Sequence, residues 1–148
     1  MSLAENIGPE KQQEIYRNSL KAGDVFLKDF DEADHKKLFI IAGISGDKIF
    51  ICSVFINSEI HPAIASKPYI HKLQIPLLKK RNSFLKHNSY ANCSYPIFLN
   101  SEQIIMGIVE KTCKVIGNIH TQDLDFIQKA LIESGLLTDE QLELYFKK

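Results

Sequence analysis

Two apolar, β-prone runs joined by a polar turn constrain this chain more than any other feature. Leu38–Ile44 is a continuous apolar run, as expected of a buried strand. Ile49–Ile56 repeats the pattern after the turn Ser45–Lys48, in which Gly46 is expected to supply a positive φ. The pattern predicts a β-hairpin, and hence an antiparallel sheet.

Further strands and helices are predicted on both sides of this hairpin. The expected strands are Val25–Phe30, Tyr69–Ile75 ended by Pro76, Ser89–Asn100 interrupted at Pro96, and Lys111–Ile119. The expected helices are Glu10–Leu20 after Pro9, a helical turn at Ser101–Gly107, Gln122–Ser134 capped by Thr121 and stopped by Gly135, and Asp139–Phe146 with a capping box formed by Thr138 and Gln141.

The order of these elements predicts a mainly β, α+β fold. Short strands in succession without intervening helices favour an antiparallel sheet curled into a small barrel, with an N-terminal helix and two C-terminal helices. A length of 148 residues fits one domain. We expect an N-terminal helical extension at residues 1–22, the barrel at 23–119 and the C-terminal helices at 120–148.

Cysteine usage and hydropathy indicate a cytoplasmic protein without a membrane segment. The three cysteines are far apart and form no CxxC pair, which is typical of free, buried thiols in a reducing compartment. The apolar runs fall far short of the roughly 20 residues that a membrane helix requires. His61 and His71 are too far apart in the sequence to indicate a metal site, so neither a metal site nor a cofactor is predicted.

The charge distribution predicts an anionic partner. Overall, 18 basic residues balance 18 acidic ones, but residues 60–101 contain no Asp or Glu. Their basic residues are Lys67, Lys72, Lys79, Lys80, Arg81 and Lys86. Such a concentration of one sign favours binding to an anionic surface or ligand.

Several segments, in order, resemble the MazF/PemK family of toxin endoribonucleases. Gly23–Asp31 resembles the opening G-D-[IV]-x-x-[VA]-[DN]-[FL] strand of that family, and His35–Ile56 matches its loop, strand, turn and strand. The later matches are Ser89–Cys93 with an S-x-V-x-C strand, and Ile116–Ile119, the helix Asp123–Ile132 and Gly135-Leu136 with the closing segment.

The resemblance implies a Src-homology-type (SH3-like) barrel, a homodimer, and metal-independent cleavage of single-stranded RNA through its 2′-hydroxyl. It also implies that an acidic antitoxin peptide could be a partner. The chain departs from the family pattern at the catalytic positions. Lys37 stands where active members have Arg, and Asn92 and Ser94 replace the Arg and Asp that flank the later Cys in the PemK branch. Ser58 keeps the expected residue type.

The candidate catalytic residues are therefore His35 as proton carrier, Lys37 as the cation beside the phosphate, and Ser58. The candidate RNA-binding residues are Lys36, Asn57, Lys79, Lys80, Arg81 and Lys86. Simpler interpretations remain open: the residues 35–37 could belong to a solvated loop balanced by nearby acids, and the basic segment 79–86 could be a soluble loop or face an acidic protein.

These observations predict a toxin-type protein of a toxin-antitoxin system that binds single-stranded RNA and could cleave it. The alternative is a catalytically degenerate barrel that acts as a protein- or nucleic-acid-binding module. A third hypothesis places the working surface on the helical extensions.

Overall fold

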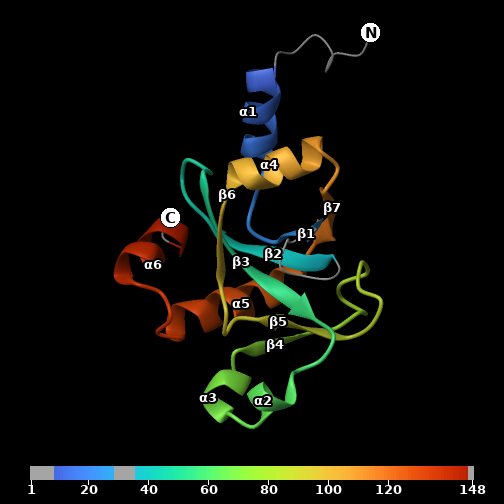
Figure 1. Ribbon diagram of the computed structural model, residues 1–148. Helices are drawn as coiled ribbons and strands as arrows, with labels where there is room; N and C mark the ends of the chain where they lie inside the picture. Colours follow the sequence, from blue (N-terminus) through green and yellow to red (C-terminus); the bar gives the residue numbers. More distant parts are fainter. Residues whose placement is uncertain (1–8, 29–35, 147–148) are drawn as a thin grey trace.

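The computed structural model describes residues 9–28 and 36–146 and shows an α+β fold (Figure 1). Its strands are β1 (Asp24–Lys28), β2 (Lys37–Ile44), β3 (Phe50–Asn57), β4 (Gln74–Leu77), β5 (Ser89–Asn92), β6 (Ile97–Asn100) and β7 (Cys113–Asn118). Its helices are α1 (Pro9–Ser19), α2 (Pro62–Ala65), α3 (Pro68–His71), α4 (Ser101–Val109), α5 (Thr121–Glu133) and α6 (Asp139–Phe146). The predicted class, an antiparallel sheet with flanking helices, is confirmed.

The strands form one antiparallel sheet in the order β4-β5-β3-β2-β1-β7, and β6 also pairs with β3. The hairpin of β2 and β3 is confirmed, with Leu38 opposite Ile56. Closure into a barrel would require the end strands β4 and β7 to pair, and no such pairing is found between these two described strands. The sheet is therefore open, and the predicted closure is not found.

The central strands are buried on both faces, which explains their uninterrupted apolar sequences. In β2, Ile40 and Ala42 belong to one core cluster, whereas Phe39 and Ile41 belong to the other. Alternate residues of a strand point to opposite faces of a sheet. Helices α5 and α6 supply side chains to the first cluster, and α4 supplies Ile104 to the second. The sheet is thus covered by helices on two sides.

Helix α5 explains why the sheet does not need to close on itself. Its buried residues Ile127 and Leu131 pack into the first cluster, and the helix contacts both β2 and the end strand β4. The helix therefore fills the space that a closed barrel would fill with side chains of its own strands. Figure 1 shows α1 and α4 stacked at one end of the molecule and α2 and α3 at the other.

Three local predictions are wrong. The segment predicted as the strand Tyr69–Ile75 contains α3, and β4 begins only at Gln74 and includes Pro76. In the β2–β3 turn the positive φ of 61° belongs to Lys48 and not to Gly46. The reason is the side chain of Asp47, which accepts hydrogen bonds from the Ser45 hydroxyl and the Ile49 amide and so fixes the turn.

The third wrong prediction concerns the start of α5. The cap is His120, whose Nδ1 accepts a hydrogen bond from the Gln122 amide at 3.1 Å, and not Thr121. The capping box of α6 is confirmed by reciprocal bonds between Thr138 and Gln141. Gly135 has a φ of 77° after α5, as expected of a helix stop. Among the described residues, no helix has the length and apolar character to cross a membrane.

Candidate nucleic-acid interface

A cleft of about 530 Å³ beside α2 brings together residues from four separate segments. We call it the α2 cleft. It is lined by Lys36, Lys37, Leu38, Ile56, Asn57, Ser58, Glu59, Ile60, His61, Pro62, Ile64, Gln74 and His87. Four of these, namely Lys36, Lys37, Asn57 and Ser58, were predicted from the sequence as site residues. Among the described residues that line it, two lysines and two histidines stand against a single carboxylate, Glu59, so this lining favours an anionic ligand.

The hairpin register explains why the two predicted pairs of residues meet. Lys37 begins β2 and Asn57 ends β3, and antiparallel pairing of Leu38 with Ile56 places these two ends side by side. Lys37 and Asn57 are half-buried, whereas Lys36 and Ser58 are exposed. The lysine ammonium groups can therefore reach a ligand, while the strand ends hold the base of the cleft in place.

Two histidines that the sequence analysis did not assign also line the α2 cleft. His61 caps α2, because its Nδ1 accepts a hydrogen bond from the Ala63 amide at 3.1 Å. Its Nε2 is then the nitrogen that carries the proton and can donate to a ligand. His87 is exposed in the segment between β4 and β5. His35, the predicted proton carrier, lies outside the described residues.

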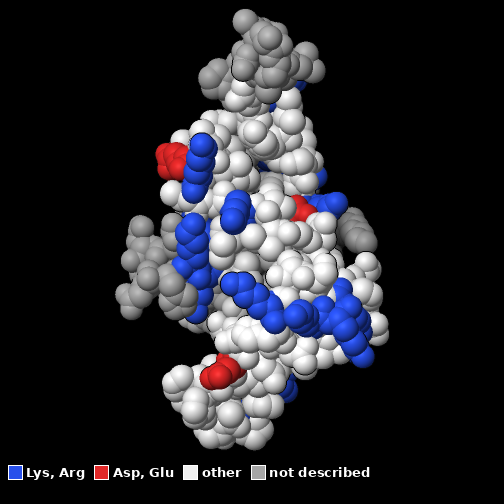
Figure 2. All heavy atoms as spheres, turned by 90° about the vertical axis from the view of Figure 1, so that its right-hand side faces the viewer, with Lys and Arg blue, Asp and Glu red and all other residues white. Residues whose placement is uncertain are grey.

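A second depression, which we call the loop hollow, lies in the segment between β4 and β5. It has a volume of about 610 Å³ and is lined by Leu78, Lys79, Lys80, Ser83 and Asn88. His87 lines the α2 cleft, and the next residue, Asn88, lines the loop hollow. Figure 2 shows a band of Lys and Arg side chains crossing the face that carries the β4–β5 segment. Lys86, also predicted to bind RNA, is exposed next to His87.

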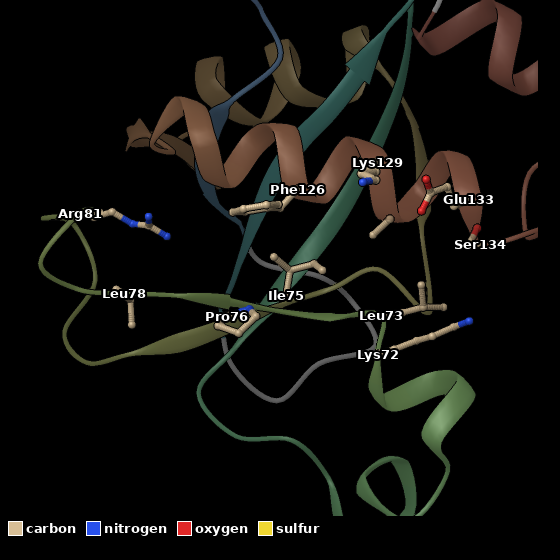
Figure 3. Close-up of a pocket in the computed structure, with 11 residues that line it drawn as sticks. Lys72, Leu73, Ile75, Pro76, Leu78, Arg81, Phe126, Lys129, Glu133 and Ser134 are labelled. Carbon is tan, nitrogen blue, oxygen red and sulfur yellow. The ribbon is translucent and has the colours of Figure 1, made fainter.

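Arg81 faces a different cleft, which we call the α5 cleft because it lies between β4 and α5 (Figure 3). This cleft has a volume of about 540 Å³, and its walls include Leu73, Ile75, Pro76 and Phe126. Figure 3 shows Arg81 at one end, with Lys72, Lys129 and Glu133 toward the other. The basic residues of the carboxylate-free stretch 60–101 therefore do not form a single patch: Lys72 and Arg81 line the α5 cleft, whereas Lys79 and Lys80 line the loop hollow.

The side chain of Arg81 is engaged within the protein. Its guanidinium forms an ion pair with Asp123, whose side chain has no exposed surface, and donates to Gln122 Oε1 at 3.3 Å. Asn82 donates to the other oxygen of Asp123 at 2.9 Å and accepts a hydrogen bond from the His120 amide at 2.9 Å. These contacts fasten the β4–β5 segment to the first turn of α5, which is a structural role that the sequence did not indicate.

The cysteines fit the expected role of buried, free thiols. Burial raises the pKa of Cys52 and of Cys93 to about 12 and that of Cys113 to about 11. Thiols with such pKa values are almost entirely protonated near neutral pH and make poor nucleophiles. Within the described part of the chain, no group of three or more His, Cys, Asp and Glu side chains is arranged to hold a metal ion.

Comparisons with known proteins leave the family assignment open. No family model matches the sequence, and no curated protein matches it either.

Proposed function

We propose that this protein binds single-stranded RNA, with the phosphates held in the α2 cleft, as the resemblance to MazF/PemK toxins implies. The observation that supports this function best is that Lys36, Lys37, Asn57 and Ser58 line one cleft, whose described walls add two histidines and only one carboxylate. A closed SH3-like barrel is not required for this proposal, because the binding residues come from one hairpin and the segments that follow it.

The chemistry of the α2 cleft suits a nucleotide backbone. The Lys36 and Lys37 ammonium groups neutralise phosphates, and Lys79 and Lys80 in the loop hollow supply two further cations for a strand that extends beyond the cleft. Asn57, Ser58 and the Nε2–H of His61 add uncharged hydrogen-bonding groups that can contact phosphate or sugar oxygens. A depression of this size accepts a group as large as a small-molecule ligand, such as one nucleotide.

Salt-dependent binding tests the proposal directly. The affinity of a short, fluorescein-labelled single-stranded RNA is measured by anisotropy over a range of KCl concentrations, for the wild type and for Lys36→Ala/Lys37→Ala. Each phosphate contact to a single strand contributes about 0.7 to the steepness of the salt dependence, so the double variant should flatten the slope by about 1.4. Binding should also weaken at every salt concentration.

The matched control is Lys11→Ala/Lys21→Ala, which removes the same charge from exposed positions. Lys11 lies on α1, at the end of the molecule opposite α2 (Figure 1), and pairs with the exposed Glu14 of the same helix. The control should keep the wild-type slope. Equal slopes for all three proteins, or no RNA binding by the wild type, would contradict the proposed function.

Cleavage is a second candidate, favoured by the position of His87 in the α2 cleft. His87 could accept the proton of the 2′-hydroxyl as the 2′-oxygen bonds to phosphorus, and Lys37 could stabilise the charge that develops on the phosphorus-bound oxygens. The bond from phosphorus to the 5′-oxygen then breaks, and this leaving oxygen takes a proton from water. Incubation with RNA, and with the same strand carrying 2′-deoxyribose, tests this step. Products from RNA that disappear in His87→Ala support cleavage, whereas binding without products supports the non-catalytic alternative. The homodimer, the acidic antitoxin peptide and the cytoplasmic location stay predictions.

A further inference from the structure

One buried polar side chain forms part of the wall of the α2 cleft. Gln74 begins β4, is only 6% exposed and still lines the cleft. A buried amide needs hydrogen-bond partners for both its nitrogen and its oxygen, because an unpaired polar atom away from water is costly. The partners of Gln74 therefore show what the side chain offers to a ligand.

A chain of hydrogen bonds fixes the orientation of the Gln74 amide. The backbone N–H of Ser94 can only donate, and it donates to Asn92 Oδ1 at 3.2 Å. The side chain of Asn92 must therefore present its oxygen here, and the atom of Gln74 that meets this oxygen at 2.8 Å must be the nitrogen Nε2. The same nitrogen donates to Ser94 Oγ at 3.1 Å.

The remaining polar atom, Gln74 Oε1, has no hydrogen-bond partner among the described residues. Gln74 lines the α2 cleft, and because its nitrogen is turned toward Asn92 and Ser94, Oε1 is the polar atom of the amide that remains to meet a ligand there. The cleft thus contains a hydrogen-bond acceptor held in one orientation by Asn92 and Ser94.

We propose that Gln74 is a specificity-determining residue, whose Oε1 accepts a hydrogen bond from an N–H group on the Watson–Crick edge of an RNA base. This inference rests on the proposed function, since the phosphates beside that base are the ones held by Lys36 and Lys37. Proteins read single-stranded RNA by hydrogen bonds to unstacked bases, and a preoriented amide supplies such a contact without losing further side-chain freedom. A donor on the base satisfies Oε1, whereas an edge that presents an acceptor there leaves both groups unpaired.

The test compares the wild type with Gln74→Met, which keeps a side chain of similar length and removes the amide. Affinities are measured for short homopolymeric RNAs of each of the four bases and for an abasic strand with the same number of phosphates. The wild type should prefer one base by roughly 3- to 10-fold, as expected of one hydrogen bond. Gln74→Met should lose this preference, while both proteins should bind the abasic strand equally.

A chemically modified RNA, combined with the Gln74 variant, tests whether the side chain and the base edge contact each other. Methylation of the Watson–Crick N–H of the preferred base should weaken binding by the wild type to the level of Gln74→Met and should not weaken the variant further. If Gln74→Met does not fold, the methylated strand and Ser94→Ala still test the inference, because Ser94→Ala removes one of the groups that hold the amide and should reduce the base preference without changing the salt slope.

The outcomes separate this inference from the proposed function. Equal affinity of the wild type for all four bases, or an unchanged preference in Gln74→Met, would overturn the role of Gln74 and leave phosphate binding intact. An absence of RNA binding by the wild type would overturn both.

Discussion

Replacing Arg81 by Met should destabilise the protein, because it leaves the buried carboxylate of Asp123 without its ion pair. Breaking a buried pair from one side costs about 3–5 kcal/mol, and a hydrogen bond to a charged group contributes about 1.5–3 kcal/mol. The Arg81 side chain is 29% exposed, and Asn82 still donates to Asp123, so some compensation remains. We therefore expect the free energy of unfolding to fall by less than the full cost of breaking a buried pair, by about 2–3 kcal/mol.

Urea denaturation followed by circular dichroism measures this loss, and an unchanged m-value shows that the unfolding transition itself is unaltered. The midpoint temperature of thermal unfolding should fall by roughly 4–12 °C, since the Tm of a chain of this size falls by roughly 2–4 °C per kcal/mol of lost stability. The matched control is Lys80→Met, because Lys80 precedes Arg81 and is exposed. It should change stability by less than about 0.5 kcal/mol. If Arg81→Met loses no more than this control, the ion pair does not anchor the segment.

Three further predictions concern the thiols, the packing of α6 and a buried carboxyl group. A thiol reagent at pH 8 should label the native protein far more slowly than the urea-unfolded chain, because burial raises the pKa of all three cysteines; fast labelling of the folded protein would contradict this explanation. Gly43→Ala should lower stability by about 1–3 kcal/mol through overpacking, since a Cβ there would lie 2.8 Å from a ring atom of α6. A protease should then cut the variant near α6 faster than the wild type, and an unchanged cleavage rate would contradict this packing explanation. Burial raises the pKa of Asp24 above 3.8, so the folded state binds this proton more tightly than the unfolded state does, and the contribution of Asp24 to stability falls as the pH rises through the window just above 3.8. As the pH rises through this window, the free energy of unfolding of the wild type should fall relative to that of Asp24→Asn. Parallel curves for the two proteins would refute the raised pKa of Asp24.

The elements that depend on local sequence were predictable. The β2–β3 hairpin follows from two apolar runs around a polar turn, and the start of α6 follows from the reciprocal caps of Thr138 and Gln141. The error at Tyr69 has a local cause as well: apolar and polar residues alternate there as in a strand, but Pro68 occupies the first helical position of α3.

Features that depend on contacts between distant segments were not predictable. Whether the sheet closes is decided by where α5 packs, and no periodicity in the strands records that position. Arg81 looked like an RNA contact because its partner, Asp123, lies 42 positions away in the sequence. In the candidate site, Lys37 and Ser58 meet through the hairpin register, which the sequence does record. Gln74 and His87 reach the same cleft only through the tertiary fold.

The open sheet also limits how copies of this chain can associate. On the outer side of β4, Pro76 has no amide hydrogen to offer an incoming strand, and at the opposite end of the sheet Lys114 on β7 is exposed and charged. Both features discourage intermolecular strand addition, which is the first step toward fibrils. An assembly of this protein should therefore use side-chain surfaces of helices or sheet faces, and each subunit should keep a complete sheet of its own.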